Sequence, residues 1–187
     1  RALDVLLEDV ARRQDHLTTG IFGTKYLLRA LTDAGRADAA YRLVNQQTFP
    51  GWGHMLEHGA TTLWEHWEYS DNTYSHNHPM FGSVSEWFYK ALAGIAPAPD
   101  AVGFDKIIIR PQPVPDLRWV RAHHDTVRGR ITSEWRQEGR RFTLHVTASP
   151  ERRCSTADVC DCAGRGGAGC LAPSKVRTPA TMRGAAR

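Results

Sequence analysis

A single carboxylate stands among aromatic residues near the middle of the chain. Residues 59 to 67 read Gly-Ala-Thr-Thr-Leu-Trp-Glu-His-Trp, so Trp64 directly precedes Glu65 and Trp67 follows two positions later. Indole rings on either side would keep water from the carboxylate and favour its protonated form, which suits a group that transfers protons. Aromatic rings also stack against the C–H faces of sugars. The same residues would also suit a surface glutamate on a helix that buries two tryptophans.

A second polar group follows shortly after. His76, Asn77 and His78 precede Pro79, and neutral imidazoles and an amide can both donate and accept hydrogen bonds with hydroxyl groups. Sugars are a natural ligand for that chemistry. The alternative is that Asn77 or His78 simply caps the helix predicted to follow.

Two patterns raise the question of a metal, and neither predicts one. His54, Glu57 and His58 fit the H-x-x-E-H pattern of inverted zinc proteases, but Gly53 and Gly59 leave barely one helical turn where that motif needs several. The four cysteines have no paired C-x-x-C spacing. They are Cys154, Cys160, Cys162 and Cys170. We therefore expect no metal and no cofactor.

Helical spacing of apolar residues predicts the scaffold for this segment. A first stripe runs from Leu3 to Val10 without a preceding cap, which suggests a helix that continues upstream of residue 1. Residues 52 to 78 have no clean period and are expected to form a loop with short helical turns, where binding and chemistry tend to lie. Short connections should pair the helices as antiparallel hairpins. Three further stripes predict helices at Phe22, Tyr26, Leu27, Ala30 and Leu31; at Ala37, Ala40, Tyr41 and Val44; and at Val84, Trp87, Phe88, Ala91 and Leu92.

The pattern changes from helical to extended after about residue 98. Runs of β-branched or alternating residues predict strands at 107–109, 131–135 and 142–146, with a turn at Glu138-Gly139 between the last two. Helices followed by strands indicate two segregated layers or domains. We place the first at 1–98 and the second at 99–148.

Residues 149–187 differ from both. The segment 151–187 has no aromatic residue, and its surplus of Ala, Gly and Arg predicts disorder. It also carries seven Lys and Arg against three acids, whereas residues 1–150 balance at 17 and 17. The net charge of +4 therefore belongs to the tail, and no nucleic-acid partner is expected. No apolar run approaches the roughly 20 residues that span a bilayer, so we expect a soluble protein without a membrane partner.

Taken in order, several segments resemble glycoside hydrolase family 78, the α-L-rhamnosidases. The likeness covers roughly residues 1–148. The motifs occur in the same order as in the family, and this order makes the resemblance specific. The segments that carry it are His16 to Ile21, Pro50 to Gly53, Gly59 to Glu65, Asn77-His78 with Phe81-Gly82, and Gly103-Phe104 with Ile107, Ile109 and Pro111.

The resemblance implies a mainly α chain: the C-terminal part of an (α/α)6 six-hairpin toroid, followed by an incomplete β-sandwich and the tail. It implies inverting cleavage of terminal α-L-rhamnosyl bonds in rhamnose-containing glycosides, and a homodimer of the whole enzyme. Glu65 matches the general base, and His78 a sugar-contacting histidine. Asn77, Trp64 and Trp52 are expected beside them in the substrate pocket.

Two departures from the family qualify this expectation. The family's general acid lies on an earlier hairpin, so we expect this chain alone to be inactive. The family's β-sandwich should continue past Val146 with another apolar strand, which the sequence lacks. A frameshift near residues 149 to 153 would explain that lack. Another six-hairpin glycosidase or lyase, or a non-catalytic carbohydrate-binding module, are the alternative functions.

Overall fold

A computed structural model describes residues 1–148 and 153–156. The chain divides into two compact units, and each is described by itself. The first comprises Arg1–Ala91 with Pro113–Pro115, and the second comprises Leu92–Gln112 with the described residues from Asp116 onward.

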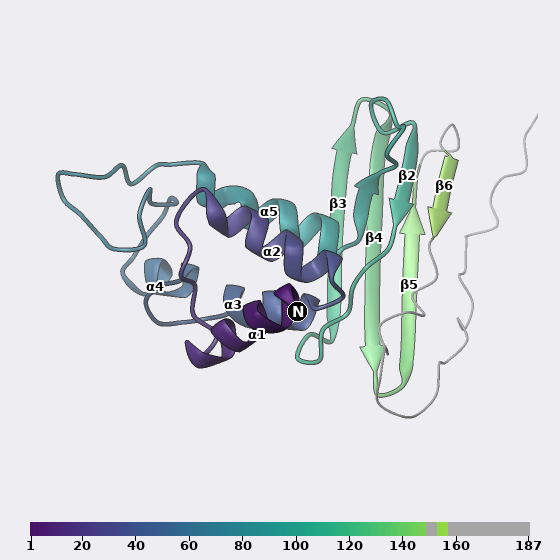
Figure 1. The fold of residues 1–187 in the computed structure, drawn as a ribbon. Helices are drawn as coiled ribbons and strands as arrows, with labels where there is room; N and C mark the ends of the chain where they lie inside the picture. The colour runs from purple at the N-terminus through teal and green to yellow at the C-terminus, as the bar shows by residue number, and fades with distance from the viewer. Residues whose placement is uncertain (149–152, 157–187) are drawn as a thin grey trace, which may run out of the picture. The chain divides into compact units, whose positions relative to one another are not determined.

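The first unit is built from helices and a long irregular segment (Figure 1). None of the helices in the described ranges has the length and apolarity that a bilayer crossing needs. The predicted helices are confirmed, and the segment after residue 51 contains one short helix within irregular chain, as expected. The elements are α1 (Ala2–Arg12), α2 (Gly23–Asp33), α3 (Ala37–Val44), α4 (Trp52–Glu57), the 3-10 turn η1 (Met80–Gly82), α5 (Ser83–Trp87) and the π-helical turn η2 (Phe88–Leu92).

The buried side of α2 differs from the predicted one. Phe22 and Tyr26 are 73% and 69% exposed, whereas the residues that α2 buries are Thr24, Leu28 and Leu31. A threonine can be buried here because its hydroxyl donates to the Gly20 carbonyl oxygen at 2.8 Å. The prediction that Phe22 and Tyr26 face the core is therefore wrong.

A partly buried hydrogen bond joins α2 to α5, which lie side by side in Figure 1. The Trp87 indole N–H donates to the Thr32 hydroxyl at 2.7 Å. Trp87 is buried, as predicted, together with Val84 and Ala91, but Phe88 is 40% exposed. The irregular segment 58–79 connects α4 to η1, directly before α5.

The second unit contains two three-stranded sheets. In the first sheet β2 lies in the middle, antiparallel to β1 and parallel to β6. In the second, β3, β4 and β5 form an antiparallel meander, and the predicted turn at Gly139 joins β4 to β5 with a positive φ of 57°. The strands are β1 (Ile95–Pro97), β2 (Lys106–Ile109), β3 (Trp119–Thr126), β4 (Gly129–Glu138), β5 (Arg141–Thr147) and β6 (Arg153–Thr156).

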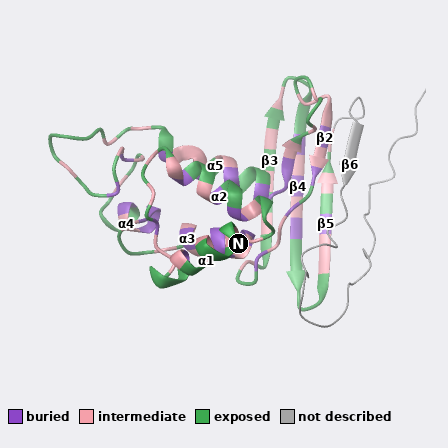
Figure 2. Ribbon diagram, viewed as in Figure 1, coloured by how far each residue is buried: buried purple, intermediate pink, exposed green. Residues whose placement is uncertain are grey.

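The two sheets share an apolar core. It contains Ile107 and Ile109 from β2, Ile131 and Trp135 from β4, and Leu144 from β5. Two buried hydrogen bonds attach β4 to the start of the unit: Trp135 donates to the Leu92 carbonyl at 2.7 Å and Ser133 to the Ala93 carbonyl at 2.7 Å. Figure 2 shows the buried residues of this unit along β2 and β4.

The disorder predicted for the tail is wrong at residues 153–156, where a strand forms, although it is not the apolar strand that the sequence lacks. Strand β6, with the sequence Arg-Cys-Ser-Thr, pairs in parallel with Lys106–Ile109. Backbone hydrogen bonds form this ladder whatever the side chains are, so the missing apolar alternation did not exclude it. The predicted disorder of the rest of the tail, the cysteines Cys160, Cys162 and Cys170, and most of the range predicted for the frameshift lie outside the described residues.

Candidate active site

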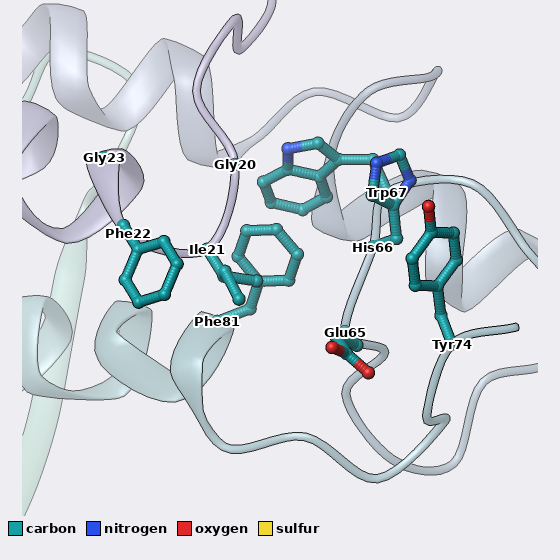
Figure 3. A pocket seen from close by; sticks show the side chains of 9 residues that line it. All are labelled: Gly20, Ile21, Phe22, Gly23, Glu65, His66, Trp67, Tyr74 and Phe81. Carbon is teal, nitrogen blue, oxygen red and sulfur yellow. The ribbon is translucent and has the colours of Figure 1, made fainter.

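Glu65 lines a cavity of about 270 Å³ in the first unit. In Figure 3 its carboxylate lies below Phe81, on the side of Tyr74. The lining residues come from two segments far apart in the chain, the approach to α2 and the irregular segment before α5. They are Gly20, Ile21, Phe22, Gly23, Glu65, His66, Trp67, Tyr74 and Phe81.

Two hydrogen bonds to one residue hold Glu65 in place. Its backbone N–H donates to the Ser75 carbonyl oxygen at 2.8 Å, and Oε2 of its carboxylate accepts from the Ser75 backbone N–H at 2.9 Å. Oε1 accepts no hydrogen bond from the described residues. One oxygen is thus fixed while the other can meet a ligand or a water molecule.

Aromatic rings form the wall above the carboxylate. Trp67 and Phe81 stack with ring centroids 3.7 Å apart, and both are almost completely buried. The Trp67 indole N–H donates to the Thr19 carbonyl oxygen at 2.8 Å, across 48 positions of sequence. This bond brings the approach to α2 against the segment that carries Glu65.

A second aromatic pair borders the cavity on the other side. The rings of His66 and Tyr74 stack in parallel, 4.8 Å apart with an interplanar angle of 12°. Both residues are exposed at the edge of the cavity. No spacing in the sequence indicates this pair, because their contact depends on the closing of the loop by Glu65 and Ser75.

The two tryptophans predicted to flank Glu65 point in different directions. Trp67 lines the cavity with it, but Trp64 does not. Trp64 is 3% exposed and packs against Tyr69 and His76, with centroids 5.2 and 5.9 Å away. The carboxylate therefore has one indole beside it.

Trp52 supports the cavity wall from behind. Its indole N–H donates to the Phe81 carbonyl oxygen at 3.2 Å, and its ring meets Trp67 edge-on at 5.1 Å. Like Trp64 it is buried and does not line the cavity.

Asn77 and His78 lie in the segment that pairs with residues 63–65, and neither lines the cavity. The His78 backbone N–H donates to the Leu63 carbonyl oxygen at 2.8 Å, and the Asn77 backbone N–H donates to the Ser75 hydroxyl at 3.1 Å. Residues 63–65 and 75–78 thus form two short segments joined by backbone hydrogen bonds. Ser75, which no pattern in the sequence indicated, bonds to both Glu65 and Asn77.

The two histidines of the H-x-x-E-H segment contact each other. The rings of His54 and His58 lie 4.1 Å apart, and the His58 ring Nδ1 bonds to the His54 carbonyl oxygen at 2.8 Å. Burial, and then the neighbouring His58, lower the pKa of His54. Within the described ranges no cluster of three or more His, Cys, Asp or Glu side chains could hold a metal ion.

Comparison with known proteins gives one consistent family. The model of the bacterial α-L-rhamnosidase six-hairpin glycosidase domain matches residues 1–92, and that of the bacterial α-L-rhamnosidase C-terminal domain matches residues 94–159. The second match continues past residues 149 to 153, so the likeness does not stop where a frameshift was predicted.

Three relatives illustrate the likeness. An α-L-rhamnosidase from Streptomyces avermitilis is 37% identical over 166 residues, which are 84% of this chain and 16% of that protein. The structure of α-L-rhamnosidase from Dictyoglumus thermophilum matches with a TM-score of 0.76 and 41% identity, over 82% of this chain and 18% of that one. The crystal structure of Streptomyces avermitilis α-L-rhamnosidase complexed with L-rhamnose matches with a TM-score of 0.76 and 36% identity, over 82% and 16%.

The chain thus spans less than a fifth of the length of these relatives. The matched part includes residues of both domains, in the order of helices and then strands that the structure shows. The chain belongs to the bacterial α-L-rhamnosidases, with their six-hairpin glycosidase domain followed by their β-sheet C-terminal domain.

Proposed function

We propose that this chain supplies the general base of an inverting α-L-rhamnosidase, and that Glu65 is that base. The observation that carries the proposal is the position of Glu65, the only carboxylate that lines the aromatic cavity within the described residues. In an inverting glycosidase a carboxylate activates water on the face of the sugar ring opposite the leaving group.

The surroundings of Glu65 suit this role in two ways. The Ser75 N–H fixes Oε2 at 2.9 Å, so the carboxylate is oriented before substrate arrives. Phe22 and Tyr74, which line the same cavity and are 73% and 42% exposed, offer apolar ring surface against which the C–H face of a sugar can pack. An oriented carboxylate next to exposed aromatic rings suits the activation of water at an anomeric carbon.

The general acid is proposed to come from a part of the enzyme outside this chain. Inverting enzymes separate their two carboxyl groups by about 6.5–9.5 Å. Glu65 has no carboxylate companion in its cavity among the described residues. We therefore propose that further hairpins complete an (α/α)6 toroid in the whole enzyme. We also propose that the isolated chain does not hydrolyse an aryl α-L-rhamnoside.

The other residues predicted for the pocket have different proposed roles. Asn77 and His78 are proposed sugar contacts, because the return segment that carries them is bonded to residues 63–65. Trp52 is proposed to support Trp67 and Phe81, which it contacts directly. Trp64 is proposed to hold the loop 66–74 closed through its contact with Tyr69.

A chimera provides the test. Residues 1–148 replace the equivalent segment of the Dictyoglumus thermophilum enzyme, to which this chain is 41% identical, so that the rest of the catalytic domain is present. The chimera should hydrolyse an aryl α-L-rhamnoside. Glu65→Gln should lower kcat by about 10²–10⁴-fold with KM little changed, because only proton transfer is lost.

Glu68→Gln is the matched control, since Glu68 is an exposed carboxylate three positions along the same loop. It should leave kcat within about twofold. A folded chimera without activity, or equal activity of the Glu65→Gln and Glu68→Gln variants, would contradict the proposal. Released sugar of the β configuration, seen by NMR before mutarotation, would establish inversion, and the α configuration would refute it.

A further inference from the structure

One tryptophan differs from all the others in the chain. Trp119, at the start of β3, is 61% exposed. The remaining five of the six tryptophans are buried, with exposures between 2% and 7%; they are Trp52, Trp64, Trp67, Trp87 and Trp135. A large aromatic ring held in water on a regular strand is an unusual use of a residue that normally enters a core or an interface.

The ring stands on the outer side of the β3-β4-β5 sheet. The inner side of β3 is defined by Val120 and Ala122, which pack against the core of the second unit. Because side chains alternate along a strand, Trp119 and Arg121 project to the opposite side. Figure 2 shows no buried residue in β3, which agrees with a strand that has one outward side and one partly covered side.

Strand register groups this outer side into two rows. Trp119 faces Arg136 on β4, which in turn faces Thr143 on β5. The next row contains Arg121, Glu134 and His145 in the same order. These six residues, with the backbone between them, line a shallow hollow of about 530 Å³. That volume falls within the range of small-ligand sites.

The charges of the hollow are largely neutralised in pairs. Arg121 Nε lies 2.8 Å from Glu134 Oε1, and Arg136 Nη1 lies 3.3 Å from Glu138 Oε1. Each guanidinium has five N–H donors, so donors remain after its ion pair, and Thr143 and His145 add groups that can donate and accept. The surface thus offers many hydrogen bonds around one aromatic ring with little net charge.

An uncharged polyol fits that combination better than an anion or a protein surface does. We propose that the outer side of the β3-β4-β5 sheet, centred on Trp119, binds an uncharged pyranose sugar. The apolar C–H face of the sugar packs on the indole, and hydroxyl groups bond to Arg136, Thr143 and the Arg121–Glu134 pair. The site lies within the second unit and is independent of the role proposed for Glu65.

The test uses the 187-residue chain and the methyl glycosides of L-rhamnose, D-galactose and D-glucuronic acid. The indole N–H signal of Trp119, assigned by its loss in Trp119→Phe, is followed by ¹H–¹⁵N NMR during titration. We expect a saturable shift with at least one of the two neutral sugars. Measured from other affected signals of the sheet, Trp119→Ala should weaken binding about tenfold, the worth of one aromatic contact.

Two further variants keep the result decisive. Thr143→Val preserves shape and the ring but removes a hydroxyl, so it should weaken binding by less than Trp119→Ala does. Glu65→Gln should leave the Trp119 titration unchanged, which separates this site from the catalytic proposal. If neither neutral sugar shifts the Trp119 signal, if only the glucuronide does, or if sedimentation shows a dimer that Trp119→Ala abolishes, the proposal is overturned.

Discussion

The Glu65 cavity and the β3-β4-β5 sheet are held together in different ways. The sheet rests on continuous ladders that span eight residue pairs between β3 and β4 and seven between β4 and β5. The cavity is assembled from irregular chain by separate contacts, among them the Glu65–Ser75 pair of bonds and the Trp67–Thr19 bond. The loop should therefore lose its geometry after a single change, whereas the sheet should lose stability only where its core or its close backbone contacts are touched.

The largest effect is expected at Gly94, where the second unit leaves no space for a side chain. Gly94 has a φ of +73°, and a Cβ there would lie 2.1 Å from the Pro111 backbone nitrogen. Gly94→Ala should cost about 3–5 kcal/mol, because both the backbone conformation and the overlap oppose it. Denaturant unfolding combined with hydrogen exchange of the β4 amides measures it.

Gly139→Ala is the matched control for that change. Its φ is +57°, but no atom lies within 4 Å of the added Cβ. Only the conformational cost of about 1–2 kcal/mol remains. Equal losses in the two variants would show that the close approach at Pro111 is not what constrains the unit.

The loop is tested next by removing one donor. Ser75→Pro deletes the N–H that holds Glu65 Oε2, and kcat of the chimera should fall about 10²-fold, as small displacements of a catalytic group do. Ser75→Ala keeps the N–H and loses only the hydroxyl that accepts from Asn77, so it should retain most of kcat. Should both variants lose kcat equally, the side chain rather than the backbone bond would be the important contact.

A pair of tryptophans compares the two regions directly. Trp135 donates to Leu92 at 2.7 Å in the sheet unit, and Trp67 donates to Thr19 at 2.8 Å beside the cavity. Trp135→Phe should cost about 1–3 kcal/mol, since it leaves a buried carbonyl unpaired. Trp67→Phe should cost less stability but lower kcat of the chimera. Thermal unfolding and steady-state kinetics on both variants would show whether this division holds or reverses.

The smallest effect concerns helix α3 and depends on pH. Asp38 accepts hydrogen bonds from Arg36 at 2.9 Å and from Arg42 at 3.0 Å. The bond from Arg36 is the largest cause, and together with the bond from Arg42 it holds the pKa of Asp38 well below its ordinary value. The charged form is thus favoured in the folded state. Its contribution is present at neutral pH and is lost as the pH falls below about 4, toward the lowered folded-state pKa.

Asp38→Asn should therefore cost about 1 kcal/mol at pH 7 and less in acid. Asp33→Asn is the control, because the Arg29–Asp33 pair is 74% and 68% exposed and should contribute little. Unfolding free energies at several pH values measure both. A loss for Asp38→Asn that does not shrink in acid would contradict the assignment.

The spacing of apolar residues predicted the helices and strands well wherever the buried residues follow that spacing. The alternation at Ile131, Ser133 and Trp135 predicts β4 because its inner residues meet one core. The prediction failed at Phe22 and Tyr26, because Thr24, whose hydroxyl is hydrogen-bonded, lies on the buried side of α2 in their place. It also failed for β6, whose ladder to β2 needs no apolar side chains.

The candidate site could be predicted only in part. The aromatic setting of Glu65 was visible in the sequence, but the turn of Trp67 toward the cavity and of Trp64 away from it was not. That choice depends on the Trp67–Thr19 bond and the Trp64–Tyr69 contact, which form only when the loop is folded. Ser75 carried no signal for the same reason: its backbone, not its side chain, holds the base.

Chemical rescue tests the central claim most directly. In the chimera, Glu65→Ala removes the proposed base and leaves space for a small anion on the face of the sugar opposite the leaving group. Added azide should restore release of the aryl group and give β-L-rhamnosyl azide, with inverted configuration at the anomeric carbon. An azide product of the α configuration, or a folded Glu65→Ala variant that releases the aryl group as fast as the parent chimera without azide, would contradict the assignment of Glu65 as the general base.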